Sequence, residues 1–168
     1  MNRGCKMMRF TIPAFLAVVI FLSAAHAGEK FECLHCYAGK TTLMHESKDL
    51  APVVTYSLDG LIMSKSENKF LDNASTHCTG LWRGIISTPA VKIINYCVTV
   101  DPDGDMLIWG SPEAGGLANQ DLLEGTGKYK GIKGNLMSEV TGRAKRPVKP
   151  GTFQQCRLFK GEFELPPK

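Results

Sequence analysis

Residues 122–134, LLEGTGKYKGIKG, are the most informative stretch of this 168-residue chain. Its glycines stand at intervals of two, four and three residues: Gly125, Gly127, Gly131 and Gly134. These intervals differ from the Gly-x-Gly-x-x-Gly pattern, and no Gly-Lys-Ser/Thr follows, so phosphate-binding loops are not predicted. Glycine permits positive φ and close backbone approach, which a sheet needs at a barrel corner. The stretch therefore favours a β-barrel, whose end we expect Tyr129 and Ile132 to plug.

The segments on either side of this stretch alternate with the period of two that β-strands have. In residues 91–100 both faces are fairly apolar, which predicts a strand that is central in its sheet. Residues 153–165 predict a long last strand with one buried face, because one parity carries Phe153, Arg157, Phe159, Phe163 and Leu165.

Shorter β-like runs lie between turn signals elsewhere in the chain. Residues 52–58 end at Asp59-Gly60, which favours a hairpin that returns through residues 61–64. Residues 78–87 and 106–109 predict further strands. About eight short strands in roughly 140 residues, with no long period of 3.6, predict an all-β fold. We expect a closed antiparallel barrel over residues 51–168, preceded by an irregular N-terminal arm, residues 28–50, that carries a Cys-x-x-Cys motif.

Residues 125–134 resemble the Gly-Thr-Gly-(Lys/Arg)-(Phe/Tyr)-x-Gly-x-(Lys/Arg)-Gly segment of the allene oxide cyclase and dirigent-like barrels, a calycin-like superfamily. The matching residues are Gly125, Thr126, Gly127, Tyr129, Gly131 and Gly134. Tyr96-Cys97, the aspartates of residues 101–105 and Gly115-Gly116 follow the order found in small secreted bacterial members.

The resemblance covers residues 76–165 and implies an eight-stranded antiparallel barrel, in a family whose members are often dimers or trimers. Those proteins steer the cyclisation or coupling of reactive apolar intermediates, chiefly by shape. Their polar catalytic residues cannot be placed on numbered positions of this chain. The resemblance therefore implies a cavity and leaves the reaction open.

Residues 1–27 have the three parts of a secretory signal peptide. Three cations precede the apolar residues 10–24, and alanines at 25 and 27 suit a signal peptidase. We therefore expect a periplasmic or secreted protein that begins at Gly28 and has no membrane span after cleavage. Removing the three cations leaves 17 basic residues against 16 acidic residues, so no electrostatic attraction to nucleic acid is predicted.

Five cysteines would remain after cleavage: Cys33, Cys36, Cys78, Cys97 and Cys156. An oxidising compartment makes disulfides the default, with at most two bridges and one cysteine left over. Cys78 and Cys97 are the favoured pair, because both lie in strand-like segments close in sequence. For Cys33 and Cys36 we expect that one of the two ties the N-terminal arm to the barrel, with redox or metal chemistry as the alternative.

Two charged segments are expected to be connections. Residues 101–105 resemble the start of a calcium loop, but the sixth and twelfth positions, Met106 and Pro112, lack the glycine and the acid that such a loop needs. A tight turn accounts for the same residues. The basic residues 143–150 favour a solvated loop, with a site for an anionic partner as the alternative. We predict no metal and no cofactor.

The predicted ligand-binding residues are Trp82, Arg83, Tyr96 and Trp109. Aromatic side chains at a barrel mouth, beside a guanidinium, can hold an apolar molecule that has a polar end. The alternative is that both tryptophans belong to the core. No catalytic residues are evident, because none of His35, His45 and His77 falls in a nucleophile motif.

Two functional classes follow from the sequence. The favoured one is a barrel that binds a small apolar molecule or an envelope protein, with homo-oligomers consistent with the family. The alternative is a cofactor-free cyclase or isomerase of the allene oxide cyclase or dirigent type. A solidly packed barrel would favour a protein partner, whereas a cavity of several hundred cubic ångströms with convergent polar groups would favour a small ligand or an enzyme.

Overall fold

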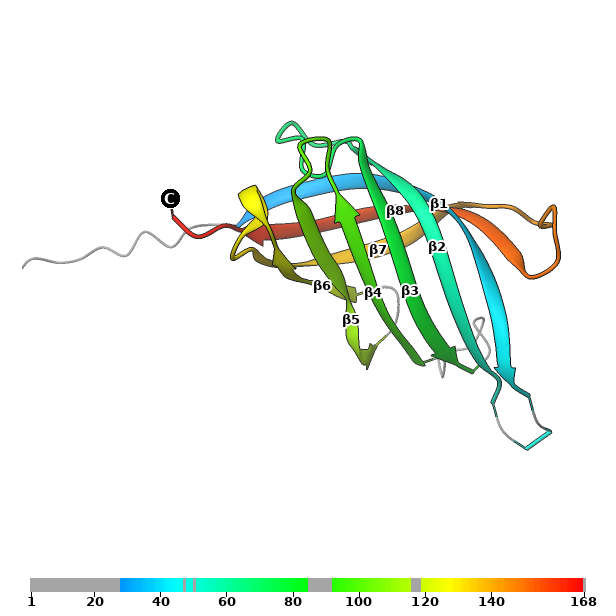
Figure 1. The fold of residues 1–168 in the computed structure, drawn as a ribbon. Helices are drawn as coiled ribbons and strands as arrows, with labels where there is room; N and C mark the ends of the chain where they lie inside the picture. The colour runs from blue at the N-terminus through cyan, green and yellow to red at the C-terminus, as the bar shows by residue number, and fades with distance from the viewer. Residues whose placement is uncertain (1–27, 47, 50, 85–91, 116–118, 168) are drawn as a thin grey trace, which may run out of the picture.

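The computed structural model describes residues 28–46, 48–49, 51–84, 92–115 and 119–167. Its strands form one closed antiparallel barrel in which each strand pairs with the next in sequence and β8 pairs with β1, as Figure 1 shows. The elements are β1 (Glu29–His45), β2 (Val53–Ser64), β3 (Ala74–Arg83), β4 (Lys92–Val100), β5 (Met106–Gly115), β6 (Asn119–Gly125), the 3₁₀ turn η1 (Gly127–Tyr129), β7 (Lys133–Arg143) and β8 (Thr152–Glu164). The predicted eight-stranded barrel is confirmed.

The alternation of side chains decides which face of each strand lies inside. In β4, Ile93, Asn95, Cys97 and Thr99 are buried, whereas the residues between them are exposed. In β8, Phe159 and Phe163 are buried on the inner parity, as the sequence predicts, but Leu165 lies past the end of the strand and is exposed. The barrel core is therefore built from every second residue of each strand.

The segment expected to be an irregular arm is the first strand of the barrel. β1 pairs along its length with β2 on one side and with β8 on the other, so it closes the sheet. Its inward residues begin with Phe31, Cys33, His35 and Tyr37. Cys33 and His35 are not ordinary apolar residues, so the sequence of this strand shows no hydrophobic period of two. The barrel consequently begins at residue 29 and not at residue 51.

Asp59-Gly60, expected to form a hairpin turn, lies inside the continuous strand β2. The two residues pair with Ala38 and Tyr37 of β1. A Cβ atom at Gly60 would lie 2.6 Å from Nε2 of His35. The glycine therefore provides room for the imidazole ring on the inner face, which is a packing reason for a residue that in sequence resembles a turn signal.

Other predicted strand limits shift by a few residues. The strand expected at 78–87 is β3, which begins earlier, at Ala74, and ends at Arg83. Residues 85–87 of that prediction, and residue 91 of the next, lie outside the described residues. The strand expected at 106–109 continues as β5 to Gly115.

One end of the barrel is sealed by aromatic side chains. The ring of Phe70 stacks on Phe163 with 4.3 Å between centroids, and Phe31 lies 4.5 Å from Phe70. Tyr129 of η1 meets Phe70 edge-on at 5.9 Å. Tyr129 and Ile132 are both buried in this cluster. In Figure 1 this end carries η1 and the C-terminus, while the β7–β8 connection lies at the opposite end.

Two disulfides cross between paired strands. Cys78–Cys97 joins β3 to β4, which confirms the favoured pair, and Cys36–Cys156 joins β1 to β8. Cys36 is thus the motif cysteine that ties the first strand to the last. Both bridges are consistent with an extracellular or periplasmic protein.

Cys33 is the free cysteine of the described residues. It lies three positions from Cys36 on a strand and therefore faces the opposite side of the sheet, inside the barrel. Its thiol donates a hydrogen bond to the backbone oxygen of Phe70, 3.2 Å away. Burial raises the pKa of the Cys33 thiol to about 12, so it stays protonated and unreactive at neutral pH.

The predicted signal peptide, residues 1–27, lies outside the described residues. Among the residues that are described, no helix has the length and apolar character needed to cross a membrane.

Candidate ligand-binding cavity

The half of the barrel away from η1 is hollow. It encloses a cavity of about 420 Å³ that is lined by side chains from all eight strands. At its outer rim lie Val140, Arg143 and Gly151, which are exposed, so the cavity opens to solvent beside the β7–β8 connection. The barrel is therefore packed at one end and open at the other.

Aromatic rings make up much of the cavity wall. Tyr56 lies 5.5 Å from Trp82, measured between ring centroids, and Trp109 meets Phe159 edge-on at 5.2 Å. Tyr37 meets Phe153 edge-on at 6.1 Å nearer the mouth. Glycine makes part of this arrangement possible, since a Cβ atom at Gly80 would lie within 2.6 Å of the Tyr56 hydroxyl. Such a wall suits a flat apolar molecule.

His35 lies in the cavity lining and is only 1% exposed. Its ring is surrounded by Tyr37, Phe159 and Trp109, at centroid distances of 4.7, 5.2 and 6.0 Å. Neither ring nitrogen has a hydrogen-bond partner within the described part of the chain. Burial, and secondly the charge of Arg157, lowers the pKa of His35 from 6.5 to about 3. The imidazole is therefore neutral at pH 7, with both nitrogens unpaired.

Arg157 is the neighbour of His35 across the β1–β8 pair. Its Nε donates to Oγ of Ser138 and one terminal nitrogen donates to the backbone oxygen of Ser138, both at 3.0 Å. These two bonds to β7 fix the guanidinium at the cavity wall. None of the described side chains that line the cavity carries a carboxylate. The described cavity lining thus holds the guanidiniums of Arg157 and Arg143 without a carboxylate to match them.

Buried amides form a second polar patch in the cavity wall. Nε2 of Gln120 and the backbone N–H of Ser111 both donate to Oδ1 of Asn95, each at 3.2 Å. Near the mouth, Nε2 of Gln155 donates to the hydroxyl of Tyr37 at 2.7 Å. These groups already have hydrogen-bond partners within the protein, so they fix the geometry of the cavity wall and are not free to bind a ligand.

Trp109 is held in one orientation by a hydrogen-bond chain below the cavity. Its Nε1 donates to Oγ1 of Thr99 at 2.8 Å, and Thr99 donates to Oγ1 of Thr76 at 3.0 Å. All three side chains are buried. The indole face is therefore preorganised as a rigid surface of the cavity.

The structure separates the four predicted ligand-binding residues into two pairs. Trp82 and Trp109 line the cavity. Tyr96 is 48% exposed and points outward, because strand alternation puts Asn95 and Cys97 inside instead. Arg83, the last residue of β3, is exposed and is not among the lining residues. The cavity guanidiniums belong to Arg157 and Arg143.

Sequence reasoning missed His35 and Arg157 as site residues, although one signal was present. Arg157 shares the parity of Phe153 and Phe159 in the last strand, and a cation on an otherwise apolar face indicates a special environment. His35 had no such signal, because its strand was not predicted.

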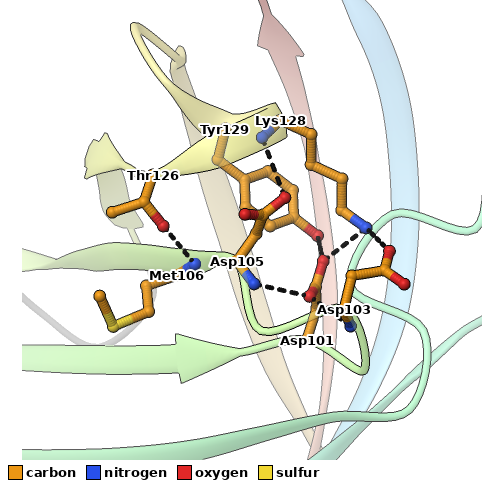
Figure 2. Close-up of polar contacts among 7 residues, drawn as sticks. All are labelled: Asp101, Asp103, Asp105, Met106, Thr126, Lys128 and Tyr129. Carbon is orange, nitrogen blue, oxygen red and sulfur yellow. Dashed lines mark hydrogen bonds and ion pairs between the residues drawn. The ribbon is translucent and has the colours of Figure 1, made fainter.

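The aspartates of residues 101–105 form a turn at the sealed end, shown in Figure 2. The carboxylate of Asp101 accepts backbone N–H bonds from Asp103 at 2.9 Å and Asp105 at 3.0 Å. It also accepts the hydroxyl of Tyr129 at 3.0 Å, and the Lys128 ammonium bridges Asp101 and Asp103. Burial alone would raise the pKa of Asp101, but the bonds from Lys128 and Tyr129 outweigh it and lower that pKa.

The glycine-rich segment contains η1 and contacts this turn. Thr126 Oγ1 accepts the backbone N–H of Met106 at 2.8 Å (Figure 2). Gly127 has φ +49°, and a Cβ atom there would overlap the carboxylate of Asp105. Gly125, Gly131 and Gly134 lie on the same side of the barrel as this turn, away from the cavity lining. The motif that carries the family resemblance therefore serves the sealed end.

No protein-family model matches the chain, and no curated protein matches it. Among solved structures, the chain is similar to the pterocarpan synthase dirigent protein PsPTS1, with a TM-score of 0.46 and 14% identity over 82% of this chain and 96% of that chain. It is also similar to the pterocarpan synthase dirigent protein GePTS1, with a TM-score of 0.43 and 12% identity over 82% and 94%.

Proposed function

We propose that this chain is a secreted or periplasmic binding protein that holds one small, largely apolar molecule in the open half of its barrel. The observation that carries the proposal is the cavity of about 420 Å³, whose largely aromatic wall opens to solvent beside the β7–β8 connection. Pockets of about 300–1,000 Å³ with apolar walls and few polar groups are typical of small-molecule sites. The two disulfides support an oxidising location.

The cavity favours a small ligand over an envelope protein as the main partner. A protein partner needs an extended outer surface, whereas the unpaired polar atoms of His35 lie inside the barrel. Filling the cavity removes apolar wall from water at roughly 25 cal/mol per Å². At about 0.4 kcal/mol per heavy atom, a ligand of about 17 heavy atoms would bind with a dissociation constant on the order of 10 µM.

Titratable groups in the cavity favour binding over acid–base catalysis. The pKa of His35 is about 3, which makes the imidazole a weak base at pH 7. Burial raises the pKa values of Tyr37 and Tyr56, so both hydroxyls stay neutral and hold their protons. A general acid or base works best with a pKa near the operating pH, and none of these three groups has one.

A cofactor-free cyclase or isomerase is the second candidate. One observation favours it: aromatic rings packed around the neutral His35 form a rigid wall that could direct a reactive intermediate by its shape. In that case a ligand would leave the cavity chemically changed. Mass spectrometry of ligands before and after incubation with the protein separates the two candidates.

The binding proposal is tested with phenylnaphthylamine, an uncharged aromatic probe that fluoresces in apolar surroundings. We expect saturable binding to residues 28–168 with a dissociation constant on the order of 10 µM, and energy transfer from tryptophan. Val140→Trp places a bulky ring at the cavity mouth and should weaken binding about tenfold or more.

Val148→Trp is the matched control, because Val148 is 95% exposed on the β7–β8 connection and does not line the cavity. This variant should bind the probe as the wild type does. Absence of saturable binding by the wild type, or equal binding by the Val140→Trp variant, would contradict the proposal.

A further inference from the structure

Resting on the proposed function, we infer that the ligand carries an anionic oxygen group, such as a carboxylate or sulfonate, which pairs with Arg157 inside the cavity. The inference concerns the chemical class of the ligand and not its identity. Three observations lead to it: the fixed guanidinium of Arg157, the absence of a matching carboxylate among the described lining residues, and the unpaired imidazole beside it.

Arg157 is preorganised to receive an anion. Two of its five N–H donors are used by Ser138, which fixes the plane of the guanidinium. Planar guanidinium groups bind carboxylates through paired N–H bonds, and such charge-assisted bonds are stronger than neutral ones. The arginine is partly buried at the wall, so its charge is felt more strongly inside the cavity than it would be at the surface.

A neutral apolar ligand would bind this cavity less tightly than an amphipathic anion of the same shape. When it filled the space it would desolvate the Arg157 cation without supplying a counter-ion, which is costly. A ligand with an anionic group keeps the cation paired while its apolar body covers the aromatic wall. The cavity therefore selects for amphipathic anions over neutral molecules of the same shape.

His35 is the inner-face neighbour of Arg157 and leaves the charge of the guanidinium unbalanced. It lies opposite Arg157 in the β1–β8 register, and it is neutral, so one of its ring nitrogens carries a hydrogen that no described residue accepts. Nε2 of His35 lies against Gly60 of β2, on the other side of β1 from Arg157, so the imidazole provides no negative partner for the guanidinium.

Two probes with the same aromatic body test the inference. Phenylnaphthylamine is neutral, and anilinonaphthalene sulfonate differs from it by one sulfonate. We expect the wild type to bind the sulfonate about tenfold more tightly than the neutral probe. Arg157→Gln should remove that preference, and Arg157→Lys should restore part of it by returning the charge. Arg146→Gln, on the exposed β7–β8 connection, should keep the wild-type preference.

The outcomes distinguish this inference from the function on which it rests. Equal binding of the two probes by the wild type overturns the anionic class and leaves small-molecule binding standing. Loss of the preference in Arg146→Gln, with Arg157→Gln unchanged, also overturns it, because the anion then lies on the loop. If neither probe binds the wild type, the binding function itself fails. Circular dichroism spectra and thermal midpoints of the variants confirm that each one is folded.

Discussion

His35 and Arg157 are the residues on which the account of the site depends. Both lie on the inner face of the β1–β8 seam, and neither contributes an ordinary apolar side chain to the core. A buried imidazole with two unpaired nitrogens and a cavity-wall cation are each unfavourable for stability. Their presence is therefore better explained by ligand binding than by packing.

The pKa of His35 makes a prediction about stability and pH. The folded pKa is about 3 and the ordinary value is 6.5, so between these pH values the unfolded chain binds more protons than the folded one. The contribution of neutral His35 to the free energy of unfolding is fully present above about pH 6.5 and is lost progressively as the pH falls toward 3. The difference between pH 7.5 and pH 4.5 should be about 3 kcal/mol from this residue.

Urea unfolding at both pH values measures the effect. In the His35→Asn variant, the free energy of unfolding should fall by about 3 kcal/mol less between pH 7.5 and pH 4.5 than in the wild type. The His77→Asn variant, which replaces an exposed histidine, should show the wild-type fall. Other titrating groups are shared by the wild type and His35→Asn, so they cancel in the comparison. An unchanged pH dependence in His35→Asn would show that the residue is not buried in neutral form.

At the scale of elements, the sealed end depends on the turn between β4 and β5 and on η1. The carboxylate of Asp101 accepts hydrogen bonds from two backbone N–H groups and from the Tyr129 hydroxyl, and it pairs with the Lys128 ammonium. One carboxylate therefore connects the β4–β5 turn to η1. The glycine-rich segment gives η1 the backbone freedom to approach this carboxylate cluster.

A matched pair of substitutions tests the role of Asp101. Its side chain is 2% exposed, whereas that of Asp103 is 76% exposed, although both contact Lys128. Asp101→Asn should lower the free energy of unfolding by about 2–4 kcal/mol, because it removes a buried charge from its donors. Asp103→Asn should cost less than about 1 kcal/mol, as exposed ion pairs do. Equal losses in urea unfolding would contradict this division of roles.

The elements also show what sequence patterns can and cannot reveal. β4 was predictable from its run of β-branched and apolar residues, and β8 from the period of two along its length. β1 was not, since Cys33 and His35 replace apolar residues on its inner face. Asp59-Gly60 has the composition of a turn, and only the position of His35 explains the glycine inside a strand.

At the scale of the whole molecule, the central feature is a barrel that is packed at one end and hollow at the other. The sequence could predict closure and strand number, but not this division. Whether a barrel is filled depends on how inner side chains from all eight strands meet in space, and the phenylalanines at the sealed end come from β1, β8 and the β2–β3 connection. Contacts between residues so far apart in the sequence leave no local sequence pattern from which they could be predicted.

The most direct test is a nuclear magnetic resonance titration of ¹⁵N-labelled residues 28–168 with phenylnaphthylamine. Probe binding inside the barrel should shift the indole N–H signals of Trp82 and Trp109 and the amides of inner-face residues around His35. The amides of Tyr96 on the outer face and of Asp103 at the sealed end should stay in place. Shifts confined to the outer face, with the Trp109 indole unchanged, would contradict the claim that the cavity is the binding site.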